Sequence, residues 1–310
     1  MRSALGLYGL LLLLMTRPVL HRRHWVDRAP RLAILAWQAS SVGLISALLL
    51  LAVLPLAPVT DIGVDLVHLV HACGTALTSH DVGVAEVVLL VVAFAVLLAL
   101  CRIGWRQARV NRRARRQQRE LIDLVTTPLN GNGPTACLLE HETPLAYCVP
   151  GRGPRIVVTT GARDALTRTA LELVLRHEQA HLRGRHHLLL LWARVLRTAL
   201  PLPVFRTGEA EIAQLVEMLA DDAVLEPAER RSLAHAVLAL GGPGPAGALG
   251  VGIGARGAER RVARLLGLPR ALPRSQRWAL AAASLSVTTL PWLTVTPALA
   301  AWSGQCVLPA

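Results

Sequence analysis

The sequence contains no lysine, few aromatic residues and no paired cysteine motif. All 33 basic residues are therefore arginines, and against 20 acidic residues they give a formal net charge of +13. The cysteines form no CxxC pair and have no regular spacing, which excludes a cysteine-based metal framework and a disulfide scaffold. They are Cys73, Cys101, Cys137, Cys148 and Cys306. The arginine-rich stretch 102–119 has Trp105 as its only aromatic residue and carries no nucleic-acid-binding motif, so we expect no nucleic-acid partner.

In contrast to lysine and the aromatic residues, hydrophobic residues are abundant in the sequence. They make up 53% of the 310 residues, and the mean hydropathy of +0.45 is too high for an ordinary soluble protein. Four apolar runs approach or exceed the length of about 20 residues that a membrane helix needs. They cover residues 4–20, 32–56, 84–101 and 278–298. We therefore predict a mainly α-helical integral membrane protein with four transmembrane helices and the lipid bilayer as a partner.

The arginines are distributed unevenly around these runs. Eight lie in 102–119, whereas 57–83 contains three aspartates and no arginine. Because basic residues are enriched in cytoplasmic loops, the segment after residue 101 is predicted to be cytoplasmic and the aspartate-bearing loop external. The chain is then a multi-pass cell-membrane protein with both termini outside. We divide it into a membrane region, a cytoplasmic domain, and a fourth membrane helix with a short external tail, at 1–101, 102–277 and 278–310.

The cytoplasmic domain is predicted to combine helices with a small β-hairpin. Two β-prone runs, 145–149 and 155–160, flank a Pro-Gly-Arg-Gly-Pro loop whose composition suits a hairpin turn. Thr167 or Thr169 can cap a helix that continues to the glycine at position 184. Other helices are expected at 161–166, 187–200, 209–225, 227–240 and 260–266.

The helix before Gly184 carries the residues with the clearest chemistry, His177-Glu178-Gln179-Ala180-His181. Two histidines four residues apart project from one face of a helix, so both imidazoles can bind one metal ion. A carboxylate directly after the first histidine can take the proton of a metal-bound water. This pattern predicts zinc bound by His177 and His181, with Glu178 as general base in peptide hydrolysis.

A hydrolytic zinc site needs three protein ligands and one open position, and two residues compete for the third place. Glu217 lies 36 residues after His181, with Asp221 one helical turn later on the same face. That spacing lets Glu217 bind the metal while Asp221 accepts the outer N–H of a ligating histidine. The rival is His187, which completes an HExxHxxGxxH pattern. Because that pattern also requires a methionine-containing turn, and Met218 lies within a predicted helix, we favour Glu217.

Two smaller questions stay open on the residues alone. His235 or an arginine of 259–264 can donate a hydrogen bond to the oxyanion that develops in peptide hydrolysis, although lone histidines and arginines on amphipathic helices are usually surface groups. Cys73 and Cys306 are both external in the predicted topology and can form a disulfide or remain two unrelated thiols.

Three stretches together resemble the M56 family of membrane metallopeptidases. They are Ala-Tyr-Cys-Val-Pro-Gly-Arg-Gly-Pro-Arg-Ile-Val-Val-Thr-Thr-Gly at 146–161, the histidine motif, and Glu-Met-Leu-Ala-Asp-Asp at 217–222. The resemblance implies zinc held by His177, His181 and Glu217, and a domain similar to the gluzincin fold of minigluzincins and M48 peptidases. It also implies a cytoplasmic protein substrate, such as a repressor cleaved during signalling. The sequence ends at Ala310 without the external penicillin-binding domain of the related β-lactam sensors, so we do not expect β-lactam sensing.

A second class of function competes with the enzyme. In a non-catalytic membrane sensor or scaffold, zinc would only stabilise the domain that passes a signal across the bilayer. Glu178 argues against this alternative, because a structural zinc site has no use for that carboxylate and tends to close its fourth position.

Overall fold

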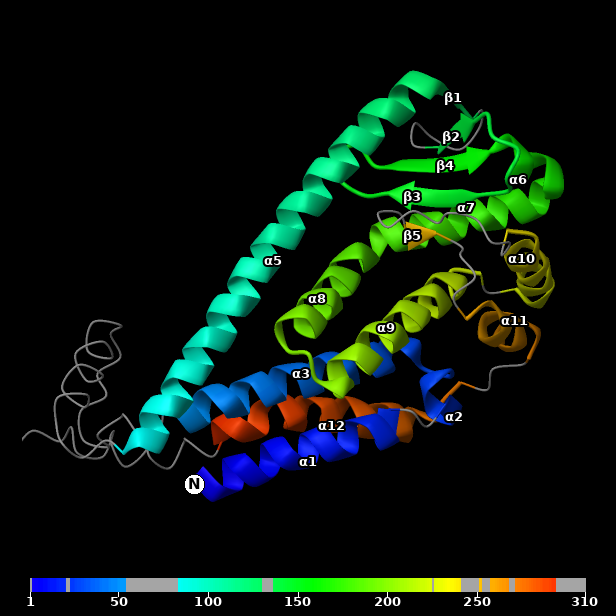
Figure 1. The fold of residues 1–310 in the computed structure, drawn as a ribbon. Helices are drawn as coiled ribbons and strands as arrows, with labels where there is room; N and C mark the ends of the chain where they lie inside the picture. The colour runs from blue at the N-terminus through cyan, green and yellow to red at the C-terminus, as the bar shows by residue number, and fades with distance from the viewer. Residues whose placement is uncertain are drawn as a thin grey trace, which may run out of the picture. The chain divides into compact units, whose positions relative to one another are not determined.

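The computed structural model describes residues 2–20, 23–53, 83–129, 136–224, 226–240, 251–252, 257–267 and 271–293. The described chain is mainly helical with one small sheet (Figure 1). It divides into two compact units. The first unit comprises Met1–Arg23, Leu32–Leu100 and Pro273–Ala310, and the second comprises His24–Arg31 and Cys101–Leu272.

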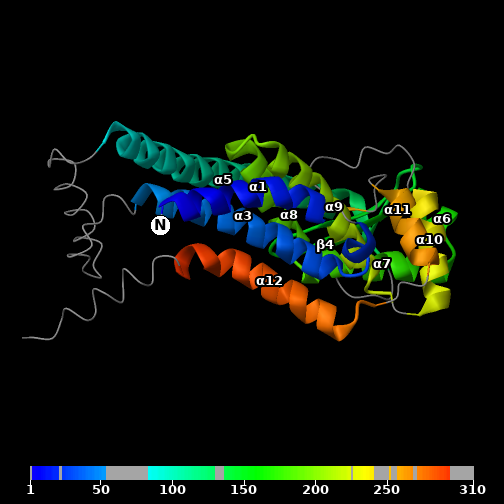
Figure 2. The ribbon, with the colours of Figure 1, turned by 90° about the horizontal axis from the view of Figure 1, so that it is seen from below.

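Within the described residues, the first unit contains α1 (Arg2–Leu20), α3 (Pro30–Val53), the first part of α5 (Val84–Val125) and α12 (Arg274–Leu293). Helices α1, α3 and α12 lie side by side (Figure 2). They meet at Gly43 of α3, where the missing side chain leaves room for Tyr8 of α1 and the backbone of Val287 of α12. The Tyr8 hydroxyl donates a hydrogen bond to the Val287 carbonyl, so a residue larger than glycine at position 43 would separate these helices.

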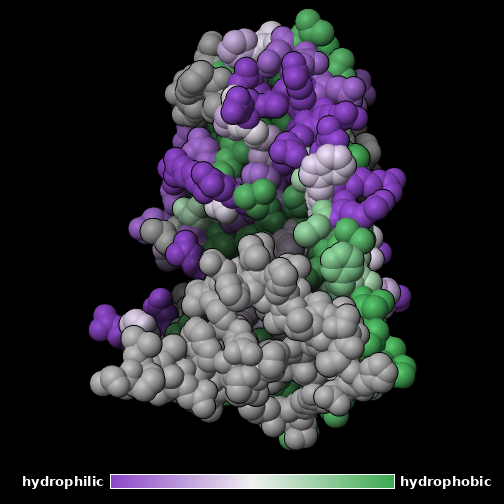
Figure 3. Space-filling view, turned by 90° about the vertical axis from the view of Figure 1, so that its left-hand side faces the viewer, coloured by the Kyte–Doolittle hydropathy of each residue, from purple (hydrophilic) through white to green (hydrophobic). Residues whose placement is uncertain are grey.

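Two of the described helices have the length and composition of membrane spans, at Pro30–Ala52 and Val87–Val125. The predicted spans 4–20 and 278–298 correspond to α1 and α12. The apolar part of α1 is only Leu5–Leu14, and α12 does not reach the same apolarity within the described residues. On α5, large apolar side chains such as those of Val91 and Phe94 are exposed. Figure 3 shows a strip of hydrophobic residues along the lower right edge of the face that it presents. Length and composition thus indicate membrane association for two helices, and four spans stay a prediction.

Helix α5 joins the third predicted span, 84–101, to the arginine-rich stretch 102–119. The two segments form one continuous helix of 42 residues, about 63 Å long at the usual rise per residue. The boundary between the two compact units falls within it, between Leu100 and Cys101. Continuity is favoured because no proline or glycine cluster interrupts this stretch and its arginines and glutamines are good helix formers.

The second unit contains a five-stranded sheet with strand order β1-β2-β4-β3-β5. The predicted hairpin is confirmed, since β3 pairs antiparallel with β4, and Gly153 in its loop has a φ of +70° that favours glycine. The pairing of β2 with β4 is parallel. The prediction missed β1, β2 and β5, which are short and lack an alternating pattern. The strands are β1 (Thr126–Pro128), β2 (Ala136–Leu139), β3 (Ala146–Val149), β4 (Arg155–Thr159) and β5 (Val251–Gly252).

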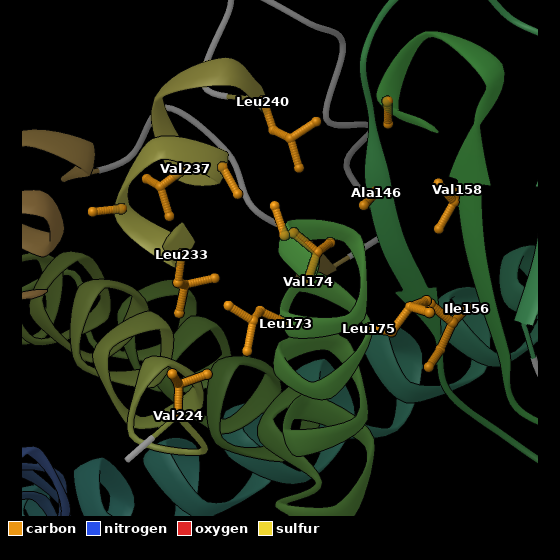
Figure 4. Close-up of a cluster of buried hydrophobic side chains, with 14 of the residues drawn as sticks. Ala146, Ile156, Val158, Leu173, Val174, Leu175, Val224, Leu233, Val237 and Leu240 are labelled. Atoms are coloured by element: carbon orange, nitrogen blue, oxygen red, sulfur yellow. The ribbon is translucent and has the colours of Figure 1, made fainter. Parts of the chain in front are cut away.

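The core of this unit lies between the sheet and the helices beside it (Figure 4). Ile156 of β4 lies beside Leu175 of the helix that carries the histidine motif (Figure 4), while Val157 belongs to a separate cluster with Ile122 and Val149. The alternation follows from the two-residue period of a strand. The sheet thereby supports one side of the motif helix along its length.

Most helices of the second unit lie close to the predicted positions, but α9 spans Pro203–Asp221 instead of 209–225, and α2 was not predicted. Thr167 caps the motif helix, because its side chain accepts a hydrogen bond from the Ala170 N–H, and Gly184 ends it. Besides the second part of α5, the helices of this unit are α2 (Arg23–Val26), α6 (Thr160–Ala165), α7 (Arg168–Arg183), α8 (His186–Ala199), α9 (Pro203–Asp221), α10 (Pro227–Leu240) and α11 (Ala258–Leu266). The motif helix is α7. Helix α9 packs against α7, α8 and α11, so residues far apart in the sequence meet between α7 and α9.

Candidate metal centre

Two helices supply the central residues of the site. Helix α7 carries His177, Glu178 and His181, and α9 carries Glu217. All four are buried, with 0% of the His177 and Glu178 side chains and 7% of Glu217 exposed. Polar groups at this depth need partners, because burying them unpaired costs free energy.

The donor atoms of three of these residues converge. His177 Nε2 and His181 Nε2 are 3.1 Å apart. The Glu217 carboxylate lies against both rings, with Oε2 3.5 Å from His177 Nε2 and Oε1 3.5 Å from His181 Nε2. Among the described residues, these three form the group whose geometry allows them to hold a metal ion.

The other ring nitrogen of each histidine also has a neighbour. Asp221 Oδ1 is 3.0 Å from His177 Nδ1, as the spacing of Glu217 and Asp221 on one helix face predicts. His186 Nδ1 is 2.9 Å from His181 Nδ1. Because both Nδ1 atoms face protein partners, both Nε2 atoms point to the same place between α7 and α9.

Arg261 of α11 connects the two carboxylates of α9. Its guanidinium forms a double contact with Asp221, at 2.9 Å from Nε to Oδ2 and 2.6 Å from Nη2 to Oδ1. Its Nη1 is 3.0 Å from Glu217 Oε2. The Arg261 side chain is 1% exposed, so a full positive charge lies inside the protein beside the site.

The electrostatics of the site favour a cation between the two histidines. Burial lowers the pKa of His181 to about 3, which keeps its imidazole neutral. Burial also acts to lower the pKa of His177, but hydrogen bonds with Asp221 and Glu217 outweigh it and raise the pKa to about 9. Carboxylates on one side of the site thus stabilise positive charge at the point where the Nε2 atoms meet.

Glu178 stands apart from this group. Burial raises the pKa of Glu178 to about 8, although nearby His177 opposes the rise. The described residues give its oxygens no N–H or O–H donor, and the Cys148 thiol of β3 lies beside them. A buried carboxylate with a raised pKa is suited to accept and return a proton near neutral pH.

Residues 105–226 match the family model described as Peptidase family M48. That match supports a zinc metallopeptidase of the M48 type, and it spans α7 and α9. No curated protein and no solved structure matches the chain. M48 peptidases are typically zinc-dependent, and His177, His181 and Glu217 are residue types that bind zinc.

Distances and charge both fit a zinc ion. Donors at the corners of a tetrahedron, each at a usual zinc bond length, lie about 3.3–3.6 Å apart, close to the 3.1 and 3.5 Å found here. The Glu217 carboxylate supplies negative charge beside the two ring nitrogens, and two imidazoles with one carboxylate are a ligand set that zinc accepts.

Glu217, rather than the rival His187, meets the two histidines. His187 is half-buried on α8 and does not belong to the group of donor atoms, because Gly184 ends α7 and a new helix directs His187 away. His235 is exposed on α10. Of the arginines in 259–264, Arg261 reaches the site, but its guanidinium is engaged by carboxylates.

Sequence reasoning missed three neighbours of the site. Arg261 was one of several arginines with no distinguishing pattern, and Cys148 was one of several scattered cysteines. His186 lacks a pattern that distinguishes a surface histidine from one beside a metal ligand, and in the structure it is 3% exposed and lies against His181. The adjacent glycine, Gly184, was the available signal for His186, since it marks a sharp turn between α7 and α8.

Cys73 and Cys306 lie outside the described residues, so their disulfide stays a prediction.

Proposed function

We propose that the chain is an integral-membrane zinc endopeptidase of the M56 type that cleaves a cytoplasmic protein during signal transduction. A transcriptional repressor is the substrate that the resemblance suggests. The observation that carries the proposal is the convergence of His177, His181 and Glu217 from two helices, with the buried carboxylate of Glu178 beside them. The M48 match over both helices supports the same chemistry.

The roles of the residues follow from their positions. Zinc held by His177, His181 and Glu217 would act as a Lewis acid, which would polarise the scissile carbonyl and lower the pKa of a water molecule. Glu178 takes a proton from the attacking water and returns it to the nitrogen of the leaving amine. Asp221 holds His177 in the tautomer with a proton on Nδ1 and its lone pair on Nε2.

The second candidate, a scaffold with structural zinc, is disfavoured by the ligand set. Structural zinc sites are closed by four protein ligands, whereas the described residues bring three together. Glu178 is also kept buried at a cost in free energy that a purely structural site would not require.

Replacing Glu217 by glutamine tests the ligand set. We expect zinc affinity to fall by at least about 100-fold, the upper end of what loss of an outer partner alone costs. The purified full-length chain in detergent would be titrated against a competing chelator, and cleavage of a denatured casein and of a peptide library would be followed. The matched control is Glu209→Gln on the same helix, whose carboxylate pairs with Arg194 and Arg197 instead. Equal zinc affinity in both variants would remove Glu217 from the site.

The predicted orientation is tested with sealed membrane vesicles. Trypsin cleaves after arginine, and the second unit has exposed arginines on α5 such as Arg112 and Arg116. We expect trypsin to fragment this unit in inside-out vesicles and to leave it intact in right-side-out vesicles. Cleavage only in right-side-out vesicles would place the site outside the cell and contradict a cytoplasmic substrate.

A further inference from the structure

The turn between α7 and α8 brings a third histidine into the site. Gly184 and Arg185 separate the two helices, and His186 is the first residue of α8. The His186 ring stands edge-on to the His181 ring, with centroids 4.9 Å apart and planes at 89°. The His186 side chain is 3% exposed, so the contact is enclosed by protein.

The direction of the hydrogen bond follows from the chemistry of imidazole. When His181 Nε2 uses its lone pair to bind a metal, the proton of the neutral ring must be on Nδ1. His181 Nδ1–H then donates to His186 Nδ1, 2.9 Å away, and His186 carries its own proton on Nε2. We propose that His186 is the positioning residue of His181, holding its tautomer and ring orientation for zinc, as Asp221 does for His177.

The local backbone is shaped for this contact. A Cβ on Gly184 would lie 2.3 Å from His186 Nε2, closer than atoms can approach, so only glycine leaves room for the folded-back ring. Arg185 has a φ of 49° and is the one non-glycine residue with positive φ in the described chain. A left-handed conformation costs free energy for a residue with a side chain, and such strain concentrates at functional sites.

The two ligand histidines therefore have different outer partners. His177 faces the carboxylate of Asp221, which is itself held by Arg261, whereas His181 faces a neutral imidazole. A neutral acceptor orients the ring without adding a negative charge to a site that already contains the carboxylates of Glu217 and Asp221. The inference rests on the proposed zinc site, and it concerns metal binding rather than hydrolysis.

The test compares two substitutions of His186 in the full-length chain. In His186→Asn the amide oxygen lies near the place of Nδ1 and can accept the same hydrogen bond, whereas leucine in His186→Leu cannot. We expect His186→Leu to weaken zinc binding about 10- to 100-fold and to change the visible absorption spectrum of the cobalt-substituted protein. His186→Asn should recover most of the affinity and the wild-type spectrum. His187→Leu, at the next position of α8, serves as the control with affinity near the wild type.

A second variant separates this role from a loss of folding. Gly184→Ala displaces the His186 ring and should weaken zinc binding as much as His186→Leu does. The double variant Gly184→Ala/His186→Leu should bind zinc no more weakly than either single variant, because both substitutions remove the same interaction. Wild-type affinity and spectrum in His186→Leu, or additive losses in the double variant, would overturn the inference. A chain whose zinc binding depends on His186 but which cleaves no peptide would contradict the proposed function and support this inference.

Discussion

Replacing Glu178 by glutamine is expected to reduce peptide hydrolysis by about 100- to 10,000-fold, the usual range for loss of a general base, while the chain keeps its zinc. Glutamine has nearly the same shape as glutamate but cannot accept the proton of the attacking water. The three converging donors do not include Glu178, so the metal should remain. The Glu178→Gln variant is therefore expected to lose peptide hydrolysis without losing metal binding.

The measurement combines initial rates on casein with the zinc content of the same preparation. Glu172→Gln is the matched control, because Glu172 lies on the same helix, is only partly buried and pairs with Arg168. We expect Glu172→Gln to retain both activity and zinc. A Glu178→Gln chain that cleaves at the wild-type rate would exclude Glu178 as the base and return the scaffold interpretation to consideration.

The second large effect is expected at Arg261. Replacing it with methionine keeps much of the side-chain volume but removes the charge that faces Asp221 and Glu217. Breaking a buried ion pair leaves an uncompensated charge and costs about 3–5 kcal/mol. We therefore expect the metal-free protein to unfold at a clearly lower temperature, and added zinc to restore part of the stability, because a cation replaces some of the lost positive charge.

Thermal unfolding of the purified full-length chain, followed by circular dichroism with and without zinc, measures this effect. The control is Arg260→Met on the same helix. The partners of Arg260, Asp27 and Glu211, are partly exposed, so this substitution should lower the free energy of unfolding by less than Arg261→Met. Adding Asp221→Asn to Arg261→Met should recover stability, since it neutralises one of the stranded charges. Equal stability of Arg261→Met and the wild type would show that the buried pair is not needed to hold α11 against α9.

Local signals located most elements of the second unit. The Gly- and Pro-rich loop indicated the β3–β4 hairpin, and Thr167 and Gly184 marked the ends of α7, because caps and turns depend on the residues at those positions. The pairing of β2 beside β4 was not predictable in this way. It is a parallel contact between two strands with β3 between them in the sequence, and it depends on long-range packing.

The sequence by itself determined that His177 and His181 share a helix face, with Glu178 directly after the first of them, because helical periodicity converts spacing into direction. It also placed Glu217 and Asp221 on one face of a second helix. Only the tertiary structure decided which third residue meets the histidines, and that Arg261 and His186 complete the surroundings. Those contacts join separate elements, and distances between elements depend on how the helices pack rather than on any local pattern.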